Sequence, residues 1–312
     1  MSEPAFIAGD WGTSRLRLYL CDASGHVLAR GEGEGAAVPG HAARFAAAVA
    51  AWDQAHGKPP ALLGGMVGST VGWKEVPYLN CPARPEALAA AALRFEHEDR
   101  AIAIVPGLKC VNRTGAPDVM RGEEVQVFGA LALLGLADAD ATVVLPGTHS
   151  KWVEVRGGRV QRFRTCMSGE LYALLREHSI LGRGVPAPAQ AHDPDFWNRE
   201  AFMHGLQQAQ RSNSLLASAF SARSRVLMQQ LEATAVPDYL SGLVIGEELR
   251  VAHDWMPSDP AQRPLVVVGA AALTERYALA LQADGQTVRC VGAEATWQGL
   301  MQIARSVPAR SG

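Results

Sequence analysis

The chain has 312 residues, of which 48% are hydrophobic and 19% are charged, and its formal net charge is −2. This composition excludes intrinsically disordered and collagen-like chains, because it contains ample apolar residues and no strict glycine repeat. A near-neutral balance also argues against a nucleic-acid-binding protein, which normally carries a basic excess. At about 150 residues per domain, the length predicts two domains.

The five cysteines are scattered singly, with no C-x-x-C pair. This spacing argues against a disulfide framework and against a zinc site built from thiolates. The N-terminal residues show no basic segment followed by an apolar one, and no run approaches the ~18 apolar residues that a membrane span needs. We therefore expect a cytoplasmic protein that has no membrane partner.

Three strands are predicted at the start of the chain, over 5–8, 15–20 and 26–30, since leucines alternate with arginines in the second of them. Helices and strands then alternate: a helix over 41–52, a strand over 61–63, a helix over 85–95, a strand over 101–105 and a helix over 122–134. This order predicts a mixed sheet with helices on its faces.

The opening pattern recurs near the middle of the chain, where strands are predicted over 142–145, 151–156 and 159–165. The turn Gly12-Thr13-Ser14 and the turn that contains Gly147 and Thr148 are both small and hydroxyl-bearing, and each leads into a strand that begins with a cation. The recurrence predicts a duplicated domain.

The second half adds helices that interrupt this pattern, predicted over 168–178 and within 195–210, 213–233 and 239–253. The strand 265–268 follows, then a helix that reaches Leu281, a strand over 287–291 and a closing helix over 294–304. We predict a first domain over residues 1–120, joined by the C-terminal helix 294–312. The second domain is predicted over 121–293, with a helical insertion at about 167–255.

The two turns supply backbone N–H groups and hydroxyls, which form an anion site where glycine lets the backbone approach a phosphate. Asp10, at the end of the first strand, is suited to Mg²⁺, which prefers carboxylate, water and phosphate oxygens. Gly269 and Ala270 follow a buried strand, where an adenosine moiety could lie against the turn. Ordinary hairpins that only satisfy their own turns are the alternative interpretation.

Two further segments carry candidate chemistry. The loop 64–74 contains four glycines, Ser69, Trp73 and Lys74, so it either lines a substrate site or is a packed Ω-type loop. Arg121-Gly122-Glu123-Glu124 opens a helix, where carboxylates favour the helix dipole. A carboxylate at that position is also suited to accept a proton from a sugar hydroxyl during phosphoryl transfer.

Together these stretches resemble the 2-dehydro-3-deoxygalactonokinase family, within the actin/hexokinase/heat-shock-chaperone ATPase superfamily. The resemblance extends from about residue 5 to 305 and is carried by Asp10–Arg17, Gly65–Ser69, Met120–Glu124, Pro146–Trp152, Ser168–Leu171 and Gly269–Ala272. It implies an α/β fold of two duplicated RNase H-like (actin-like ATPase) domains. Each would carry a βββαβα-type mixed sheet, and the two would flank a nucleotide cleft.

The resemblance further implies ATP- and Mg²⁺-dependent phosphorylation of the terminal 6-hydroxyl of 2-dehydro-3-deoxy-D-galactonate, giving 2-dehydro-3-deoxy-6-phosphogalactonate in galactonate catabolism. Glu123 and Asp118 compete for the role of base, and Glu123 is favoured. Asp10 would hold the metal, and Arg121 or Lys74 the substrate carboxylate. The remaining implied contacts are Gly12, Thr13, Ser14, Gly147, Thr148, Lys151, Gly269 and Ala270 for ATP, and Ser69, Trp73 and Glu170 for the sugar acid.

Two other functions stay open at the level of sequence. One is a kinase of a different sugar, neutral or amino. The other is an actin-like ATPase that uses nucleotide for a conformational switch, although such a switch has no need of the loop 64–74. The expected partners are a small sugar acid and ATP, and a homodimer is compatible with the pattern.

Overall fold

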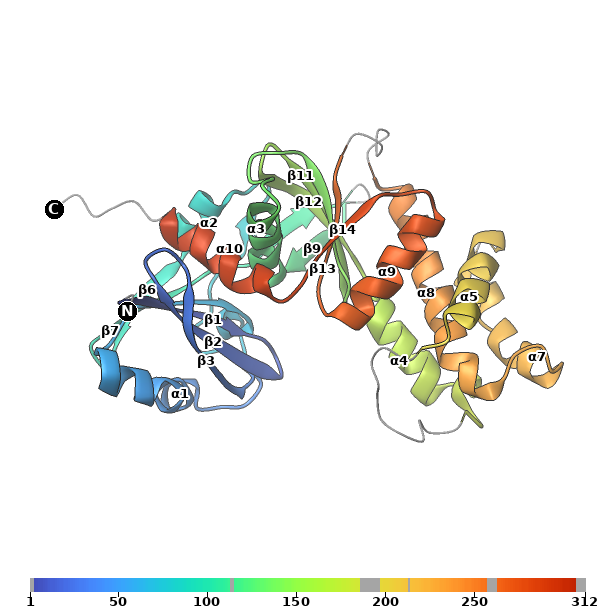
Figure 1. The fold of residues 1–312 in the computed structure, drawn as a ribbon, viewed down its shortest axis with the longest axis horizontal. Helices are drawn as coiled ribbons and strands as arrows, with labels where there is room; N and C mark the ends of the chain where they lie inside the picture. The colour runs from blue at the N-terminus through green and yellow to red at the C-terminus, as the bar shows by residue number, and fades with distance from the viewer. Residues whose placement is uncertain (1–2, 113–114, 186–196, 213, 257–262, 307–312) are drawn as a thin grey trace. The chain divides into compact units, whose positions relative to one another are not determined.

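The computed structural model describes residues 3–112, 115–185, 197–212, 214–256 and 263–306 (Figure 1). Parts of the expected insertion, at 186–196 and 213, lie outside these residues, as does the end of the expected C-terminal helix. The chain divides into two compact units. Unit 1 comprises Met1–Ala141, Val153–Arg164 and Ala293–Gly312, and unit 2 comprises Thr142–Trp152 and Thr165–Gly292.

Unit 1 is built on a six-stranded mixed sheet with the strand order β3-β2-β1-β4-β7-β6. The β1–β2, β2–β3 and β6–β7 pairs are antiparallel, whereas the β1–β4 and β4–β7 pairs are parallel. The strands are β1 (Pro4–Trp11), β2 (Arg15–Asp22), β3 (Val27–Glu34), β4 (Ala61–Gly65), β6 (Leu93–His97) and β7 (Arg100–Ile104).

The core of this sheet follows from the alternation along β2. Leu16, Leu18 and Leu20 are at most 2% exposed and share one face of the strand. Helix α1 (His41–His56) packs on this core through Phe45, whose ring lies 6.4 Å from that of the fully buried Trp11. The predicted three-stranded opening of the chain is therefore confirmed.

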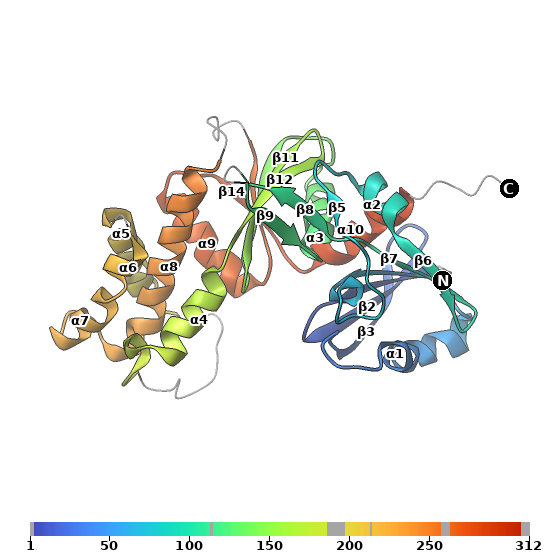
Figure 2. The ribbon, with the colours of Figure 1, turned by 180° about the vertical axis from the view of Figure 1, so that it is seen from behind.

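A second, three-stranded sheet of unit 1 was not expected from the sequence. It has the order β5-β8-β9, from β5 (Leu79–Asn80), β8 (Leu108–Val111) and β9 (Pro117–Met120) (Figure 2). The helix predicted over 85–95 is also too long. Helix α2 ends at Ala91, and Leu93–His97 forms β6, because its alternating side chains pair with β7.

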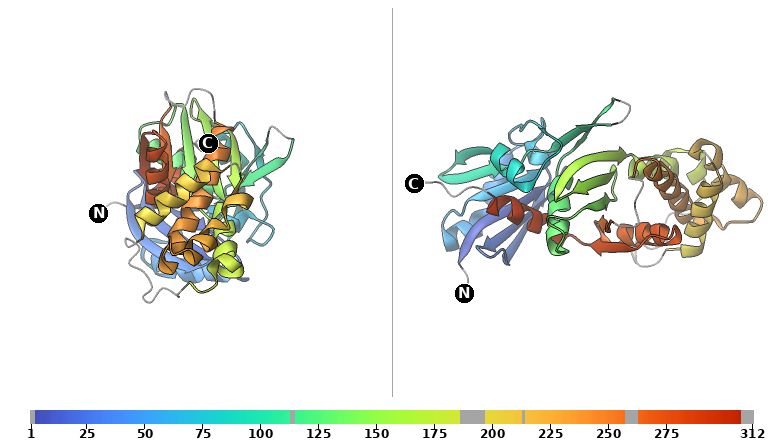
Figure 3. Two further views of the ribbon diagram at one scale, coloured as in Figure 1. Left: turned by 90° about the vertical axis from the view of Figure 1, so that its right-hand side faces the viewer. Right: turned by 90° about the horizontal axis from the view of Figure 1, so that it is seen from above.

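Helix α3 (Glu123–Leu133) and helix α10 (Glu294–Arg305) lie side by side in unit 1 (Figure 3). A Cβ placed on Gly129 would lie 1.7 Å from the carbonyl oxygen of Ala295, so only glycine allows this approach. The two helices therefore pack closely against each other, and α10 is the C-terminal helix that the sequence predicts to join the first domain.

The second sheet has the strand order β12-β11-β10-β13-β14, and most of it belongs to unit 2. The β10–β13 and β13–β14 pairs are parallel. In chain order this is the same arrangement as β3-β2-β1-β4-β7 of unit 1. The strands are β10 (Ala141–Leu145), β11 (Ser150–Arg156), β12 (Arg159–Cys166), β13 (Leu265–Val268) and β14 (Val288–Val291).

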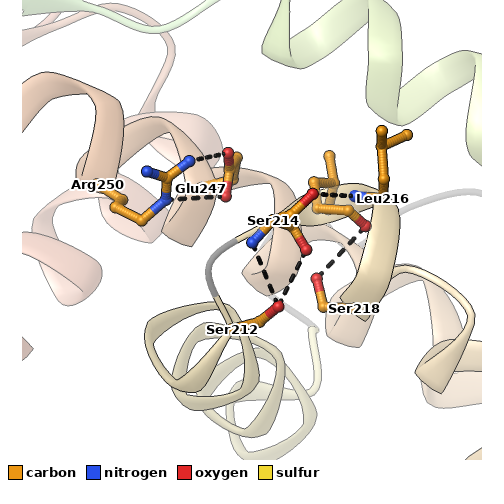
Figure 4. A network of polar contacts seen from close by, with 7 residues as sticks. Ser212, Ser214, Leu216, Ser218, Glu247 and Arg250 are labelled. Atoms are coloured by element: carbon orange, nitrogen blue, oxygen red, sulfur yellow. Dashed lines mark hydrogen bonds and ion pairs between the residues drawn. The ribbon is translucent and has the colours of Figure 1, made fainter.

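Unit 2 also contains a helical layer inserted between β12 and β13 (Figure 1). Helix α5 and helix α8 lie along each other because Gly205 and Gly242 leave room for the facing backbone. Serines cap the short helices nearby, as in the Ser214 side chain that accepts from the Leu216 N–H (Figure 4). The main helices of the unit are α4 (Ser168–His178), α5 (Arg199–Arg211), α6 (Leu215–Ser218), α7 (Ser221–Leu227), α8 (Val236–His253) and α9 (Ala271–Ala283).

Within the part of the chain that the structure describes, no helix is both long and apolar enough to span a membrane.

Candidate functional site

The first site lies in unit 1, where the parallel strands β1 and β4 end. Asp10 pairs in register with Gly64, one residue before the end of each strand. The Asp10 carboxylate accepts a hydrogen bond from Arg17 Nη1 at 3.2 Å. Burial raises the pKa of Asp10, Arg17 opposes this rise, and the negative charge of Glu123 adds to it. Asp10 and Glu123 therefore act on each other electrostatically.

The start of α3 lies directly against these strand ends. Gly65 and Gly122 have φ angles of 90° and 106°, which favour glycine. A Cβ on Gly122 would lie 3.4 Å from Gly65 Cα, and a Cβ on Gly65 would lie 3.5 Å from Asp10 Oδ1. The two glycines thus bring the first turn of α3 up to the Asp10 carboxylate, which explains the coupling of Asp10 with Glu123.

Two consecutive glutamates open α3 with different surroundings. Glu123 is partly exposed and accepts a hydrogen bond from the Arg121 N–H at 3.0 Å. Glu124 is fully buried, and its oxygens accept from the Gly122 N–H at 2.9 and 2.8 Å. Burial and the neighbouring Glu123 charge raise the pKa of Glu124 to about 8. Glu124 was not among the candidate site residues expected from the sequence, although its spacing places it on the helix face of Val127 and Phe128.

Arg121 is held between an aromatic ring and the glycine-rich loop. Its guanidinium lies 4.2 Å from the centroid of the Tyr78 ring, and Nη2 donates to the Val76 carbonyl at 2.7 Å. A Cβ on Gly68 would lie 2.8 Å from Nη1, so the loop closes tightly over the cation. Among the described residues, Arg121 Nε and Nη1 have no hydrogen-bond partner. The side chain is therefore a fixed positive charge with unused donors.

The other residues expected in the loop 64–74 have local contacts. Trp73 packs its ring 6.3 Å from that of Trp11 and, partly buried, lies against the hydrophobic core of unit 1. The Lys74 ammonium lies 4.8 Å from the centre of the Phe95 ring, and Ser69 donates to the Met66 carbonyl at 2.7 Å. These contacts agree with the packed-loop interpretation, and the substrate contacts of the three residues stay a prediction.

Asp118 lies on β9, in register with Cys110 of β8. Its carboxylate accepts a hydrogen bond from the Val119 N–H at 2.9 Å. Glu123, the other carboxylate that competes for the role of base, is among the electrostatic neighbours that perturb Asp10.

The first predicted phosphate turn is braced by the segment that follows β3. The Ala36 N–H donates to the Gly12 carbonyl at 2.8 Å, and the Ala37 N–H donates to the Thr13 carbonyl at 3.1 Å. A Cβ on Gly35 would lie 2.1 Å from the Thr13 carbonyl oxygen. Thr13 and Ser14 themselves are exposed, so their polar groups face outward from a fixed turn.

The second predicted phosphate turn lies in unit 2 and borders a cavity of about 350 Å³. The turn joins β10 to β11, and helices α4, α8 and α9 form the rest of the wall. The residues around the cavity are Gly147, Thr148, Ser168, Gly169, Tyr172, Ser241, Val244, Ile245, Leu273, Arg276 and Tyr277. The size is suited to part of a small-molecule ligand.

The start of α4 contacts the backbone of this turn, just as the segment after β3 contacts the backbone of the first phosphate turn. The Glu170 N–H donates to the Thr148 carbonyl at 3.0 Å, and a Cβ on Gly169 would lie 2.3 Å from the Gly147 carbonyl oxygen. The Glu170 carboxylate lies 2.5 Å from His149 Nε2. The buried Lys151 donates to the His149 carbonyl at 2.9 Å.

The predicted adenosine turn lies beside the second phosphate turn, since β10 and β13 are parallel neighbours. A Cβ on Gly269 would lie 3.7 Å from the carbonyl oxygen of Pro146. Ala270 then caps the N-terminus of α9, whose residues Leu273 and Tyr277 border the cavity. The structure thus brings Gly147, Thr148, Gly269 and Ala270 to one edge of the unit 2 sheet.

A buried carboxylate behind this cavity escaped the sequence analysis. Glu248 of α8 is 3% exposed, and it accepts hydrogen bonds from Trp152 Nε1 and from the Tyr277 hydroxyl, both at 2.7 Å. Burial raises the pKa of Glu248, while hydrogen bonds from the side chains of Ser168, Tyr277, Trp152 and Ser150 oppose the rise. Nothing local in the sequence marks it, because its partners come from three other elements.

Known proteins resemble this chain over nearly its whole length. The model of the 2-keto-3-deoxy-galactonokinase family matches residues 10–303. The chain is 36% identical to the 2-dehydro-3-deoxygalactonokinase of Escherichia coli strain K12, covering 97% of this chain and 98% of that one. A solved structure from Sinorhizobium meliloti, provisionally named a 2-dehydro-3-deoxygalactonokinase, is 35% identical, with a TM-score of 0.86 over 97% of this chain and all of that one.

Proposed function

Because the chain belongs to the 2-keto-3-deoxy-galactonokinase family, we propose that it transfers a phosphoryl group from ATP to the terminal 6-hydroxyl of 2-dehydro-3-deoxy-D-galactonate. The expectation of a kinase of this family is confirmed by the comparisons. The product is 2-dehydro-3-deoxy-6-phosphogalactonate, a step of galactonate catabolism. We place the enzyme in the cytoplasm, where cysteines that form no disulfide stay reduced.

The observation that carries the mechanism is the Asp10–Glu123 pair at the carboxyl ends of β1 and β4. Phosphoryl transfer needs a carboxylate that accepts the hydroxyl proton and an electrostatic partner for the phosphates. Glu123 is partly exposed at the start of α3, so it is the base in this proposal. Asp118 is the less favoured candidate, and its carboxylate accepts a hydrogen bond from the Val119 N–H of its own strand.

Mg²⁺ fits the chemistry of Asp10, a carboxylate at a strand end beside an exposed turn of hydroxyl side chains. When bound, the ion neutralises the charge on the transferred phosphoryl group. Arg17 fixes the orientation of the Asp10 carboxylate at 3.2 Å, and the raised pKa of Asp10 marks a group whose charge lacks full compensation. A cation would supply that compensation.

The nucleotide is assigned to the two turns and to the cavity of unit 2. Gly12, Thr13 and Ser14 would contact phosphate oxygens with backbone N–H groups and hydroxyls. Gly147 and Thr148 would do the same at the wall of the cavity, and Lys151 supports that turn through the His149 carbonyl. Gly269 and Ala270 would lie against the adenosine moiety.

The sugar acid is assigned to the glycine-rich loop and the start of α3. The unused donors of Arg121 are suited to a carboxylate, because guanidinium offers a planar fork. Those nitrogens are covered by the loop in this structure, so contact requires the loop to shift. Ser69, Trp73 and Lys74 shape the loop, and Glu170, in unit 2, holds His149 beside the second turn.

We also propose that the chain is a duplicated RNase H-like fold, with domains close to residues 1–120 plus the C-terminal helix, and 121–293. The equal strand orders of the two sheets support this duplication. A second similarity also supports the duplication. In each sheet, a glycine that follows the third strand lies in close contact with the backbone of the turn, Gly35 at the first turn and Gly169 at the second.

The proposal is tested by measuring sugar-dependent ADP release with a panel of acceptors. We expect turnover with 2-dehydro-3-deoxy-D-galactonate, and the epimer derived from gluconate measures stereospecificity. A neutral hexose and a reaction without sugar serve as controls. Turnover on the neutral hexose but on neither sugar acid would overturn the assignment, and ATP hydrolysis that no sugar changes would indicate a switch ATPase.

A further inference from the structure

The buried carboxylate of Glu248 has no place in the proposed reaction, although it meets three elements of the cavity wall. It is 3% exposed and lies on α8, one turn beyond Val244 and Ile245, which border the cavity. Both of its oxygens act as acceptors, one from the Trp152 indole and the other from the Tyr277 hydroxyl. A buried charge of this kind is expensive unless it is fully hydrogen-bonded.

The partners of Glu248 come from three elements, β11, α4 and α9. Tyr277 lies on α9 and borders the cavity, and its hydroxyl is 3.0 Å from Ser150 Oγ. Ser150 begins β11 directly after the turn, and its hydroxyl is 3.5 Å from the Gly147 carbonyl. Ser168 opens α4, borders the cavity, and hydrogen-bonds Glu248 as well. The second turn, α4 and α9 are therefore tied to one carboxylate.

We propose that Glu248 is the positioning residue of the nucleotide site, fixing the second phosphate turn and the start of α4 relative to α9. This inference rests on the proposed function, since it assumes that the unit 2 cavity takes ATP. Glu248 does not border the cavity, so it acts through Ser150, Ser168 and Tyr277 rather than by touching the nucleotide. A Gln at this position offers one acceptor oxygen instead of two. One of the groups that donate to Glu248 would therefore lose its hydrogen-bond acceptor.

The chain offers a matched control in Glu154. This glutamate is 2% exposed, as buried as Glu248, but its carboxylate is paired with Arg156 and Arg162. Its partners lie on β11 and β12 and do not border the cavity. Glu154→Gln therefore reports what the loss of a buried carboxylate does to the fold alone.

The test compares the KM for ATP, the KM for the sugar acid, and Tm in Glu248→Gln, Glu154→Gln and the unmodified enzyme. For Glu248→Gln we expect the KM for ATP to rise about five- to tenfold, from the loss of one hydrogen bond to a charged group, while the sugar KM changes less than about twofold. For Glu154→Gln we expect neither KM to change, even if Tm falls.

Trp152→Phe provides a second measurement if Glu248→Gln folds poorly. It removes the donor to one Glu248 oxygen at a residue outside the cavity wall, so the KM for ATP should rise about two- to threefold. In the Glu248→Gln background the same change should add nothing, because the two residues act as one unit.

Either of two results overturns the inference: an unchanged KM for ATP in both Glu248→Gln and Trp152→Phe, or equal rises of both KM values that Glu154→Gln reproduces. Failure of the proposed function looks different, since the unmodified enzyme would then show no sugar-dependent ADP release.

Discussion

The two main sheets share one strand order, but different side chains lie where their central parallel strands end. At the ends of β1 and β4 in unit 1 lie the carboxylates Asp10 and Glu123, with Glu124 buried behind them. The matching ends of β10 and β13 in unit 2 carry glycine and hydroxyl groups beside a cavity, with the buried Glu248 behind. The strand order is therefore the same at the two edges, whereas the side chains that lie there differ.

The buried glutamates show most clearly what differs. Burial and the neighbouring charge of Glu123 raise the pKa of Glu124 to about 8, although the hydrogen bond from the Gly122 N–H opposes the rise. Glu248 meets donors from several elements, which oppose the rise caused by burial. The surroundings of Glu124 thus favour its neutral form near neutral pH. The four donors around Glu248 oppose the effect of burial, which still raises the pKa of that carboxyl group.

Replacement of Glu124 by Gln should have the largest effect, on stability against pH. Because the folded pKa lies above the unfolded value of 4.5, the protonated native state is favoured below pH 4.5, and this stability is lost as pH rises through about 8. At ~1.4 kcal/mol per pKa unit, the loss amounts to about 5 kcal/mol. The variant has no group that titrates at this position, so it should not lose this stability. The free energy of unfolding of the variant minus that of the unmodified chain should therefore rise from pH 5 to pH 9. A constant difference across that range would contradict the assignment.

Replacement of Glu123 by Gln tests whether the unit 1 edge performs the proton transfer. We expect kcat to fall about 10²-fold or more while ATP still binds, because the amide cannot accept the hydroxyl proton. Asp118→Asn is the companion variant and should retain turnover within about threefold. If instead Asp118→Asn loses turnover and Glu123→Gln does not, the roles of the two carboxylates are exchanged. Isothermal titration with ATP separates binding from chemistry.

Gly35 and Gly169, which contact the backbones of the first and second phosphate turns, can be compared by replacing each with alanine. Each new Cβ would lie within 2.3 Å of a carbonyl oxygen of its turn, so the backbone must move. We expect the KM for ATP to rise about tenfold in both variants, since both turns are assigned to the nucleotide. Gly33→Ala meets only ordinary contacts at 3.4 Å and should behave like the unmodified enzyme. An effect of Gly35→Ala on the sugar KM alone would separate the functions of the two turns.

The smallest effects concern the cations of unit 1. Arg121→Lys keeps the charge but loses the planar fork, so the KM for the sugar acid should rise about five- to tenfold with the KM for ATP unchanged. Lys74→Ala should change the sugar KM less than about threefold, because its ammonium is exposed over the Phe95 ring. Initial rates at varied sugar acid measure both. A larger effect from Lys74→Ala would make Lys74 the carboxylate anchor.

Short-range patterns predicted much of this protein correctly. Leucine alternation predicted β2, the predicted bounds of α4 and β13 agree with the structure, and the recurrence of two hydroxyl-bearing turns was visible directly. The helix predicted over 85–95 was too long, because Leu93–His97 becomes a strand only through its pairing with β7. The three-stranded sheet went unnoticed for the same reason, since its short strands exist by pairing with one another.

The sequence by itself determined which residues could carry chemistry: its motifs, their order along the chain and their resemblance to a kinase family all depend on local spacing. The tertiary structure alone decided which of those residues meet. It coupled Asp10 to Glu123 through the close approach of Gly65 and Gly122, and it placed Trp73 against the core. It also revealed Glu124 and Glu248 as buried carboxylates. Their burial and their hydrogen-bond donors depend on elements that are distant in the sequence, so no local sequence pattern could predict them.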